Sequence, residues 1–91
     1  MRFEFVPSFE RSIKRLPFER KGKIKQSIMK FIDFIETGIK SEGLGLKRLK
    51  GDYWEIRATI RDRVVLYITK DVVKFIIAGN HDEIKNFLKQ I

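Results

Sequence analysis

Apolar residues recur at two different spacings along the chain, and these spacings predict helices in the first half and strands in the second. In the first half they fall three, four or seven residues apart, as on one face of a helix. We expect a short helix that is capped by Ser8 and carries Phe9 and Ile13 on its apolar face, followed by a second helix from Pro17 to about Thr37. Because Pro17 joins them tightly, the two helices are predicted to form an antiparallel hairpin.

Apolar and polar residues alternate in the second half of the chain, which is typical of strands with one buried face. These stretches are residues 46–49, 53–60, 64–69 and 72–78. The same alternation occurs at Met1–Val6, ahead of the helices. The predicted fold is therefore α+β in a single domain over residues 1–91. It has an N-terminal strand, the two-helix antiparallel hairpin, a three- to four-stranded antiparallel meander and a C-terminal helix.

The predicted C-terminal helix has a clear start and an apolar stripe that needs a partner. Asn80 and Glu83 have the spacing of a capping box, in which each side chain hydrogen-bonds to the backbone N–H of the other residue. The stripe that follows could cover the chain's own sheet, or it could contact a second copy or another protein. Its members are Ile84, Phe87, Leu88 and Ile91.

Strand alternation also assigns side chains to the two faces of the predicted sheet. Ile56 and Ile60 are expected to face the helices, so Arg57 and Arg61 face the other way. Arg63 is placed on this second, open face as well, because burial of an unpaired arginine is costly. Arginines can hold phosphate groups, and tyrosines can stack on bases. The open face is predicted to gather Tyr53, Arg57, Arg61, Arg63 and Tyr67.

The chain has a net charge of +8, which indicates what kinds of partner it could bind. Many of the basic residues lie on the two predicted helices, where acidic residues are few. Such a surface is either simply solvated, or it attracts a nucleic acid or an acidic protein. The basic residues that we single out there are Arg11, Lys14, Arg15, Lys21 and Lys25.

The composition excludes several kinds of site. Because the chain has no cysteine, it has no disulfide, no cysteine-ligated metal and no thiol nucleophile. A single histidine makes a zinc site an unexpected feature, and we expect neither metal nor cofactor. The first residues lack the apolar core of a signal peptide, and no apolar run has the length of a membrane span. We therefore expect a cytoplasmic protein without a membrane partner.

His81, the one histidine, follows the predicted helix cap. A neutral imidazole can act as a general base, and cleavage of RNA requires deprotonation of a 2′-hydroxyl, stabilisation of the phosphate and protonation of the leaving oxygen. His81 with two or three arginines could perform these steps without a metal ion. The alternative is a surface histidine in a capping turn.

Three segments together resemble the RelE/ParE superfamily of toxins from type II toxin–antitoxin modules. SFERSIKRLP is similar to the first helix of that family and its usual Leu-Pro end. GLGLKRLKGDYWEIRATIRDRVVLY resembles the family's Leu-Lys-Gly turn and its two following strands. GNHDEIKNFL is similar to the Gly-x-His ending of the RelE/YafQ-like branch, which we favour. The resemblance covers nearly the whole chain.

The resemblance implies a toxin that inhibits translation by cleaving mRNA in the ribosomal A site without a metal. It would be neutralised by an acidic antitoxin and, when free, would be a monomer or weak dimer. His81 would be catalytic together with Arg63, Arg57 and Arg61, with Arg61 as the alternative to Arg63 for the basic residue that precedes the aliphatic strand. The RNA-binding residues would be Lys47, Arg48, Lys50, Tyr53 and Tyr67. The basic helical residues named above would contact the ribosome or the antitoxin.

Two alternatives remain open at this point. Members of the ParE kind inhibit DNA gyrase instead of cleaving mRNA, and a catalytically inactive relative could bind RNA without cutting it. Both stay open because Ile76 and Ile77 stand on the last predicted strand, where many active members carry an arginine.

Overall fold

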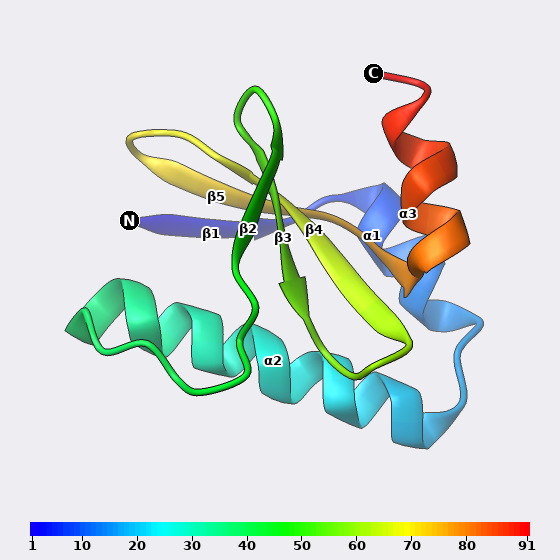
Figure 1. The fold of residues 1–91 in the computed structure, drawn as a ribbon, viewed down its shortest axis with the longest axis horizontal. Coiled ribbons are helices and arrows are strands. Elements are labelled where there is room, and N and C mark those ends of the chain that lie inside the picture. Colours follow the sequence, from blue (N-terminus) through cyan, green and yellow to red (C-terminus); the bar gives the residue numbers. More distant parts are fainter.

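The structure is a computed structural model that describes residues 1–91, and its eight elements follow the predicted order (Figure 1). They are β1 (Arg2–Phe5), α1 (Pro7–Lys14), α2 (Phe18–Thr37), β2 (Lys47–Lys50), β3 (Tyr53–Arg57), β4 (Asp62–Ile68), β5 (Val72–Asn80) and α3 (His81–Leu88). None of the helices is long and apolar enough to cross a membrane.

The strands form one five-stranded sheet in the order β1-β5-β4-β3-β2. From β2 to β5 it is the predicted antiparallel meander, with four strands. The sheet as a whole is mixed, because β1 pairs in parallel with β5, so that Arg2 lies opposite Val72. Alternation predicted the strand β1 but not its partner or direction, since this pairing joins segments that lie far apart in the sequence.

The main hydrophobic core lies between one face of the sheet and the helices α1 and α2. Helix α1 packs mainly on β5, and α2 packs on β3 and β4. Each fully buried aliphatic or aromatic side chain there contributes about 1.5–3 kcal/mol relative to exposure. The core consists of Phe9, Ile24, Ile28, Phe31, Leu44, Ile56, Val64, Leu66, Val73, Phe75 and Ala78.

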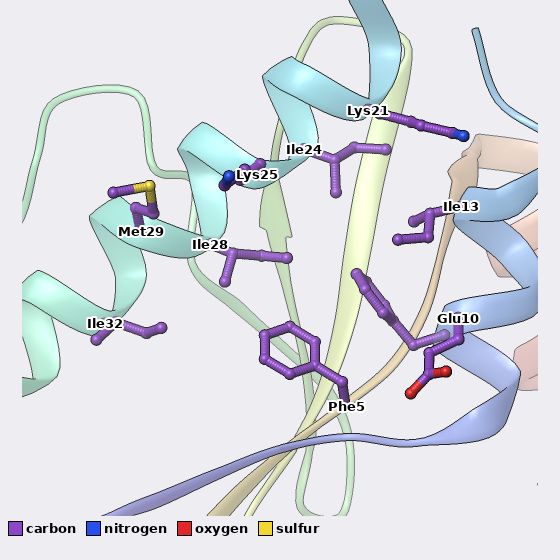
Figure 2. A pocket seen from close by; sticks show the side chains of 10 residues that line it. Phe5, Glu10, Ile13, Lys21, Ile24, Lys25, Ile28, Met29 and Ile32 are labelled. Atoms are coloured by element: carbon purple, nitrogen blue, oxygen red, sulfur yellow. The ribbon is translucent and has the colours of Figure 1, made fainter. Parts of the chain in front are cut away.

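Helices α1 and α2 follow each other through a short connection, as the sequence predicted, but they make few contacts with each other. Each packs on the sheet more than on the other helix. An apolar groove of about 550 Å³ lies between them, and Figure 2 shows Phe5, Ile13, Ile24 and Ile28 pointing into it. Phe75 of β5 contacts both helices, because its ring centroid lies 6.2 Å from that of Phe9 in α1 and 6.2 Å from that of Phe31 in α2.

The second face of the sheet is covered by α3, which packs on β5 and β4 and lies away from α2 (Figure 1). Val65 of β4 and Ile84 of α3 are both buried. Phe87 lies against Tyr53, with 5.9 Å between ring centroids. Ile84 and Phe87 of the predicted stripe therefore face the chain's own sheet, whereas Ile91 lies beyond the end of α3 and is 38% exposed.

Local hydrogen bonds decide where several elements end. The predicted capping box of Asn80 and Glu83 is confirmed, and Gly38 ends α2 in the left-handed conformation. Ser8 is not a cap: it lies inside α1 and donates to the carbonyl of Ile76. Strand β3 ends at Arg57 and not at Ile60. The prediction that Ile60 faces the helices is wrong, because this residue lies in the following turn and is 94% exposed.

Candidate functional site

A pocket of about 460 Å³ lies between α3 and the adjoining edge of the sheet. Side chains from β2, β3 and β4 form one wall, and the first two turns of α3 form the other. The pocket is lined by Gly45, Lys47, Leu49, Glu55, Arg57, Arg63, His81, Ile84, Lys85 and Leu88. It therefore gathers four cationic side chains, one carboxylate and the only imidazole of the chain.

Arg57 and Arg63 lie directly opposite each other on β3 and β4. Two like charges in this position repel each other, and Glu55 reduces the repulsion. Its Oε2 lies 3.5 Å from Nε of Arg63, and both side chains are mostly buried. Arg63 also donates from Nη1 to the carbonyl oxygen of Thr59 at 2.8 Å. Arg63 is thus held in place, whereas Arg57 is exposed and makes no side-chain hydrogen bond, so its donors are available to a ligand.

Arg57 is approached closely by the loop that precedes β2. The backbone N–H of Arg57 donates to the carbonyl oxygen of Leu44 at 2.8 Å. Gly45 has φ +62°, and a Cβ at Gly45 would come within 3.0 Å of the Arg57 Cβ. Glycine at this position allows both the backbone conformation and the close approach. The loop therefore forms part of the pocket wall, a role that its sequence did not indicate.

His81 enters the pocket from the α3 side. It is the first residue of α3, and the capping box of the neighbouring Asn80 fixes the start of the helix. Its side chain is 81% exposed, and its Nδ1 lies 3.9 Å from Oδ1 of Asp82. An exposed pair at this distance contributes little. The imidazole is therefore accessible to a substrate.

The chemistry of these groups suits a phosphodiester. Arginine guanidinium groups bind phosphate oxygens through paired hydrogen bonds, and lysines add positive charge. An accessible imidazole and a carboxylate can transfer protons beside the bound phosphate. The structure contains no group of three or more His, Asp or Glu side chains arranged to hold a metal ion.

Comparison with known proteins gives a match at the level of structure only. No family model and no curated protein matches the sequence. The RelB–RelE antitoxin–toxin complex of Methanococcus jannaschii matches with a TM-score of 0.68 and 19% identity, over 92% of this chain and 96% of that chain. The Escherichia coli DinJ–YafQ complex matches with a TM-score of 0.72 and 16% identity, over 91% and 97%. A YoeB/ParE toxin from Agrobacterium tumefaciens matches with a TM-score of 0.66 and 21% identity, over 89% of this chain and 99% of that chain.

The chain has the RelE-like fold. The matches extend over nearly the full length of both chains in each comparison. Identities of 21% and below establish a shared fold, and the activity has to be argued from the residues that this chain carries on it.

The RelE-like fold brings together some of the predicted catalytic residues. Arg57, Arg63 and His81 line the one pocket, as does Lys47 of β2. Arg61 does not line it, because the chain turns after Arg57 and leaves Arg61 exposed in the β3–β4 turn. The predicted roles of these residues stay predictions.

The other residues predicted to bind RNA lie outside the pocket. Arg48 pairs with Trp54 and lies over its ring, 5.9 Å from the centroid. Lys50 donates to the carbonyl oxygen of Ile91 at 2.7 Å, at the far end of α3. Tyr53 and Tyr67 are half-buried and pack edge to face at 4.9 Å. The face predicted to be open is thus partly covered by α3, and the rings of these tyrosines contact protein.

The basic residues of the helices lie on the other side of the sheet from the pocket. Arg11, Lys14 and Arg15 surround a shallow depression on α1. Lys21 and Lys25 border the apolar groove between α1 and α2. This RelE-like fold therefore presents two separate basic surfaces.

Glu55, Lys85 and Gly45 line the pocket but are not among the predicted site residues. Glu55 stands two residues before Arg57 on the same strand, so alternation places both on one face. Lys85 stands four residues after His81, which places both on one side of α3. These two spacings could have identified the residues. For Gly45 the sequence carries no such signal, because its contact with Arg57 depends on how the loop folds back.

Proposed function

We propose that this chain is the toxin of a type II toxin–antitoxin module, and that it cleaves mRNA on the ribosome without a metal ion. The RelE-like fold supports the toxin role. The observation that carries the nuclease proposal is the shared pocket of Arg57, Arg63 and His81. It combines the two requirements of RNA cleavage, which are fixed positive charge and a group that transfers protons.

In the proposed reaction the 2′-oxygen attacks the adjacent phosphorus. An O–P bond forms to the 2′-oxygen, the bond from phosphorus to the 5′-oxygen of the next nucleotide breaks, and a cyclic phosphate results. Arg57 and Arg63 stabilise the extra negative charge on the phosphate oxygens in the transition state. Two protons move in this step, one from the attacking 2′-hydroxyl and one to the leaving 5′-oxygen. His81 transfers one of them, as the base or the acid, and the other is exchanged with water.

Mapping of RNA 5′ ends in bacteria after brief expression tests this proposal. We expect new ends within codons of translated messages for the wild type. The variant H81A should produce none, and R57A should reduce them by about 100-fold because one phosphate donor is lost. The variant R61A is the matched control, since Arg61 is an exposed arginine four residues away that lies outside the pocket. Equal cleavage by R57A, H81A and the wild type would refute the assigned site.

Inhibition of DNA gyrase is the second candidate. The observation that favours it is that β5 contributes no cation to the pocket, since Ile76 and Ile77 stand on that strand. A supercoiling assay with purified gyrase distinguishes the two. Inhibition that survives H81A, with intact mRNA, would establish the gyrase function. Salt-sensitive RNA binding with neither cleavage nor inhibition would indicate an inactive RNA-binding relative.

An acidic antitoxin is the proposed partner of the groove between α1 and α2. The groove wall is apolar at Phe5, Ile28 and Ile32, and Lys21 and Lys25 border it (Figure 2). An amphipathic helix with acidic residues beside its apolar face complements this surface. Calorimetric titration with such a peptide tests the assignment, and no binding at any salt concentration would contradict it. The basic surface at Arg11 and Lys14 is left for ribosomal RNA.

A further inference from the structure

Arg20 and Asp62 form a paired hydrogen bond between α2 and the start of β4. Nε of Arg20 donates to Oδ2 of Asp62 at 2.9 Å, and Nη2 donates to Oδ1 at 2.6 Å. The side chain of Asp62 is 1% exposed, and that of Arg20 is 21% exposed. Asp62 is the one buried acidic residue of the chain, and the two partners lie 42 positions apart.

Asp62 is placed where the two halves of the candidate site meet. It directly precedes Arg63 in the chain. In the sheet it lies opposite Asn80, which caps α3 and directly precedes His81. The pair thus connects α2 to the start of β4, where Arg63 lies, and to the end of β5, which His81 follows.

Arg20 also interacts electrostatically with Glu83 in the first turn of α3. Its pKa is raised above the usual value, first by the hydrogen bonds to Asp62, against an opposing effect of burial, and then by the charges of Asp62 and Glu83. Glu83 is the other half of the capping box, and it accepts from the N–H of Asn80 at 3.0 Å. One guanidinium is therefore electrostatically coupled to both segments that carry site residues.

Stability alone does not explain this pair. Removing two charges from water costs several kcal/mol, and replacing a buried ion pair by apolar side chains of similar size is often neutral or stabilising. The planar guanidinium of arginine fixes both the distance and the angle to a carboxylate, and apolar side chains do not impose such a geometry.

We propose that Arg20 is a positioning residue: through Asp62 it fixes the placement of Arg63 relative to His81 in the pocket. It contacts no substrate. An effect of Arg20 on RNA cleavage rests on the proposed function. Its effect on the placement of β4 and the start of α3 does not.

The double variant R20M/D62L tests the proposal, because it removes both charges and leaves no unpaired group. We expect a melting temperature close to that of the wild type and a loss of RNA cleavage of about 10- to 100-fold, as small misplacements of reacting groups produce. The matched control R2M/E4L makes the same exchanges in the exposed pair Arg2–Glu4 of β1 and should leave cleavage unchanged. Full cleavage by R20M/D62L would overturn the proposal.

Amide hydrogen exchange gives a readout that does not require nuclease activity. We expect faster exchange in R20M/D62L at residues 62–63 and 80–83, with β1 and the middle of α2 unchanged. A uniform change across the chain would show only a general structural role, and no change would show that the pair does not hold these segments. Either result would overturn the proposal. If the wild type cleaves no RNA, the proposed function fails, and the exchange pattern still decides the positioning role. Should the double variant not fold, R20K keeps the charge without the fork and is expected to give the same local pattern.

Discussion

Arg57 and Arg61 are the same amino acid four positions apart, and only their surroundings distinguish them. Arg57 points from β3 into a pocket with three other cations, whereas Arg61 lies in the following turn. A phosphate group gains more from a donor that is already placed beside other donors, because several hydrogen bonds and charges then act on it together. The function of each arginine is therefore set by where the strand ends.

The salt dependence of RNA binding should separate these two arginines. When a lysine or arginine contacts a phosphate of single-stranded RNA, it contributes about 0.7 to the slope of log affinity against log salt. With a non-cleavable oligonucleotide we expect R57A to lower the slope by about that amount and R61A to leave it unchanged, as measured by fluorescence anisotropy. Equal slopes for the two variants would place the RNA elsewhere.

Gly45 and Gly43 allow a second test at the level of single residues. Both have positive φ, at +62° and +80°, but only Gly45 has a neighbour within 4 Å. Alanine at either position should lower the free energy of unfolding by about 1–2 kcal/mol, because a side chain disfavours this backbone conformation. Only G45A should also displace Arg57 and weaken RNA binding. Urea denaturation and anisotropy measure the two effects, and equal RNA affinity of G45A and G43A would contradict the role of the contact.

Helix α3 shows how an element supports the site. Its capping box fixes the residue at which the helix begins, and that residue is followed along one side of the helix by Ile84, Lys85 and Leu88 in the pocket wall. Ile84 is buried against the sheet, so the helix is held both at its start and along its apolar stripe.

Loss of the cap should loosen α3 before the rest of the chain. We expect N80A to lower the free energy of unfolding by about 1 kcal/mol, because the N–H of Glu83 loses its acceptor. The control N86A makes the same change at an exposed position of α3 and should have little effect or a small stabilising one. Urea denaturation followed by circular dichroism measures both. A smaller loss in N80A than in N86A would show that the box contributes nothing.

The elements could be predicted from local patterns, and their limits and partners could not. Alternation continues through Ala58 and Ile60, so the pattern alone extends β3 too far. The chain turns because Thr59 accepts hydrogen bonds from the backbone N–H groups of Arg61 and Asp62, at 3.1 and 3.0 Å. Such side chain–backbone bonds compete with strand pairing and carry no periodic signal.

The candidate site was also predictable only where local patterns define it. Alternation placed Arg57 and Arg63 on one face, and the capping box placed His81 at a helix start. That α3 would fold over that face, and so bring His81 to the arginines, depends on contacts between elements. The pair of Arg20 and Asp62 depends on such contacts as well, since nothing local connects residues 42 positions apart.

For the whole molecule, the sheet separates two surfaces of different chemistry. The pocket lies on the α3 side, and the apolar groove lies on the side of α1 and α2. A partner that occupies only the groove would leave His81 exposed. In the proposed module, an antitoxin that blocks cleavage therefore has to reach around an edge of the sheet or displace the toxin from the ribosome.

Separate surfaces should be separable by mutation. Met29 lines the groove and is 60% exposed, so M29E should fold and should repel an acidic peptide helix. We expect at least about tenfold weaker peptide binding for M29E, which corresponds to about 1.4 kcal/mol, with RNA cleavage unchanged. The control Q26E adds the same charge at an exposed position of α2 outside the groove. Calorimetry that finds the two variants equal would remove the groove as the docking site.

The parallel pairing of β1 with β5 affects how the chain folds during its synthesis. Strand β1 and helix α1 both find their main partner in β5, so they have no place to pack until residues 72–80 have been synthesised. Pairings between such distant segments form late, because a long loop has to close first. Until β5 has formed, β1 and α1 therefore lack their main packing partner and stay accessible. In the proposed module, this leaves an interval in which the antitoxin can bind the chain before its sheet is complete.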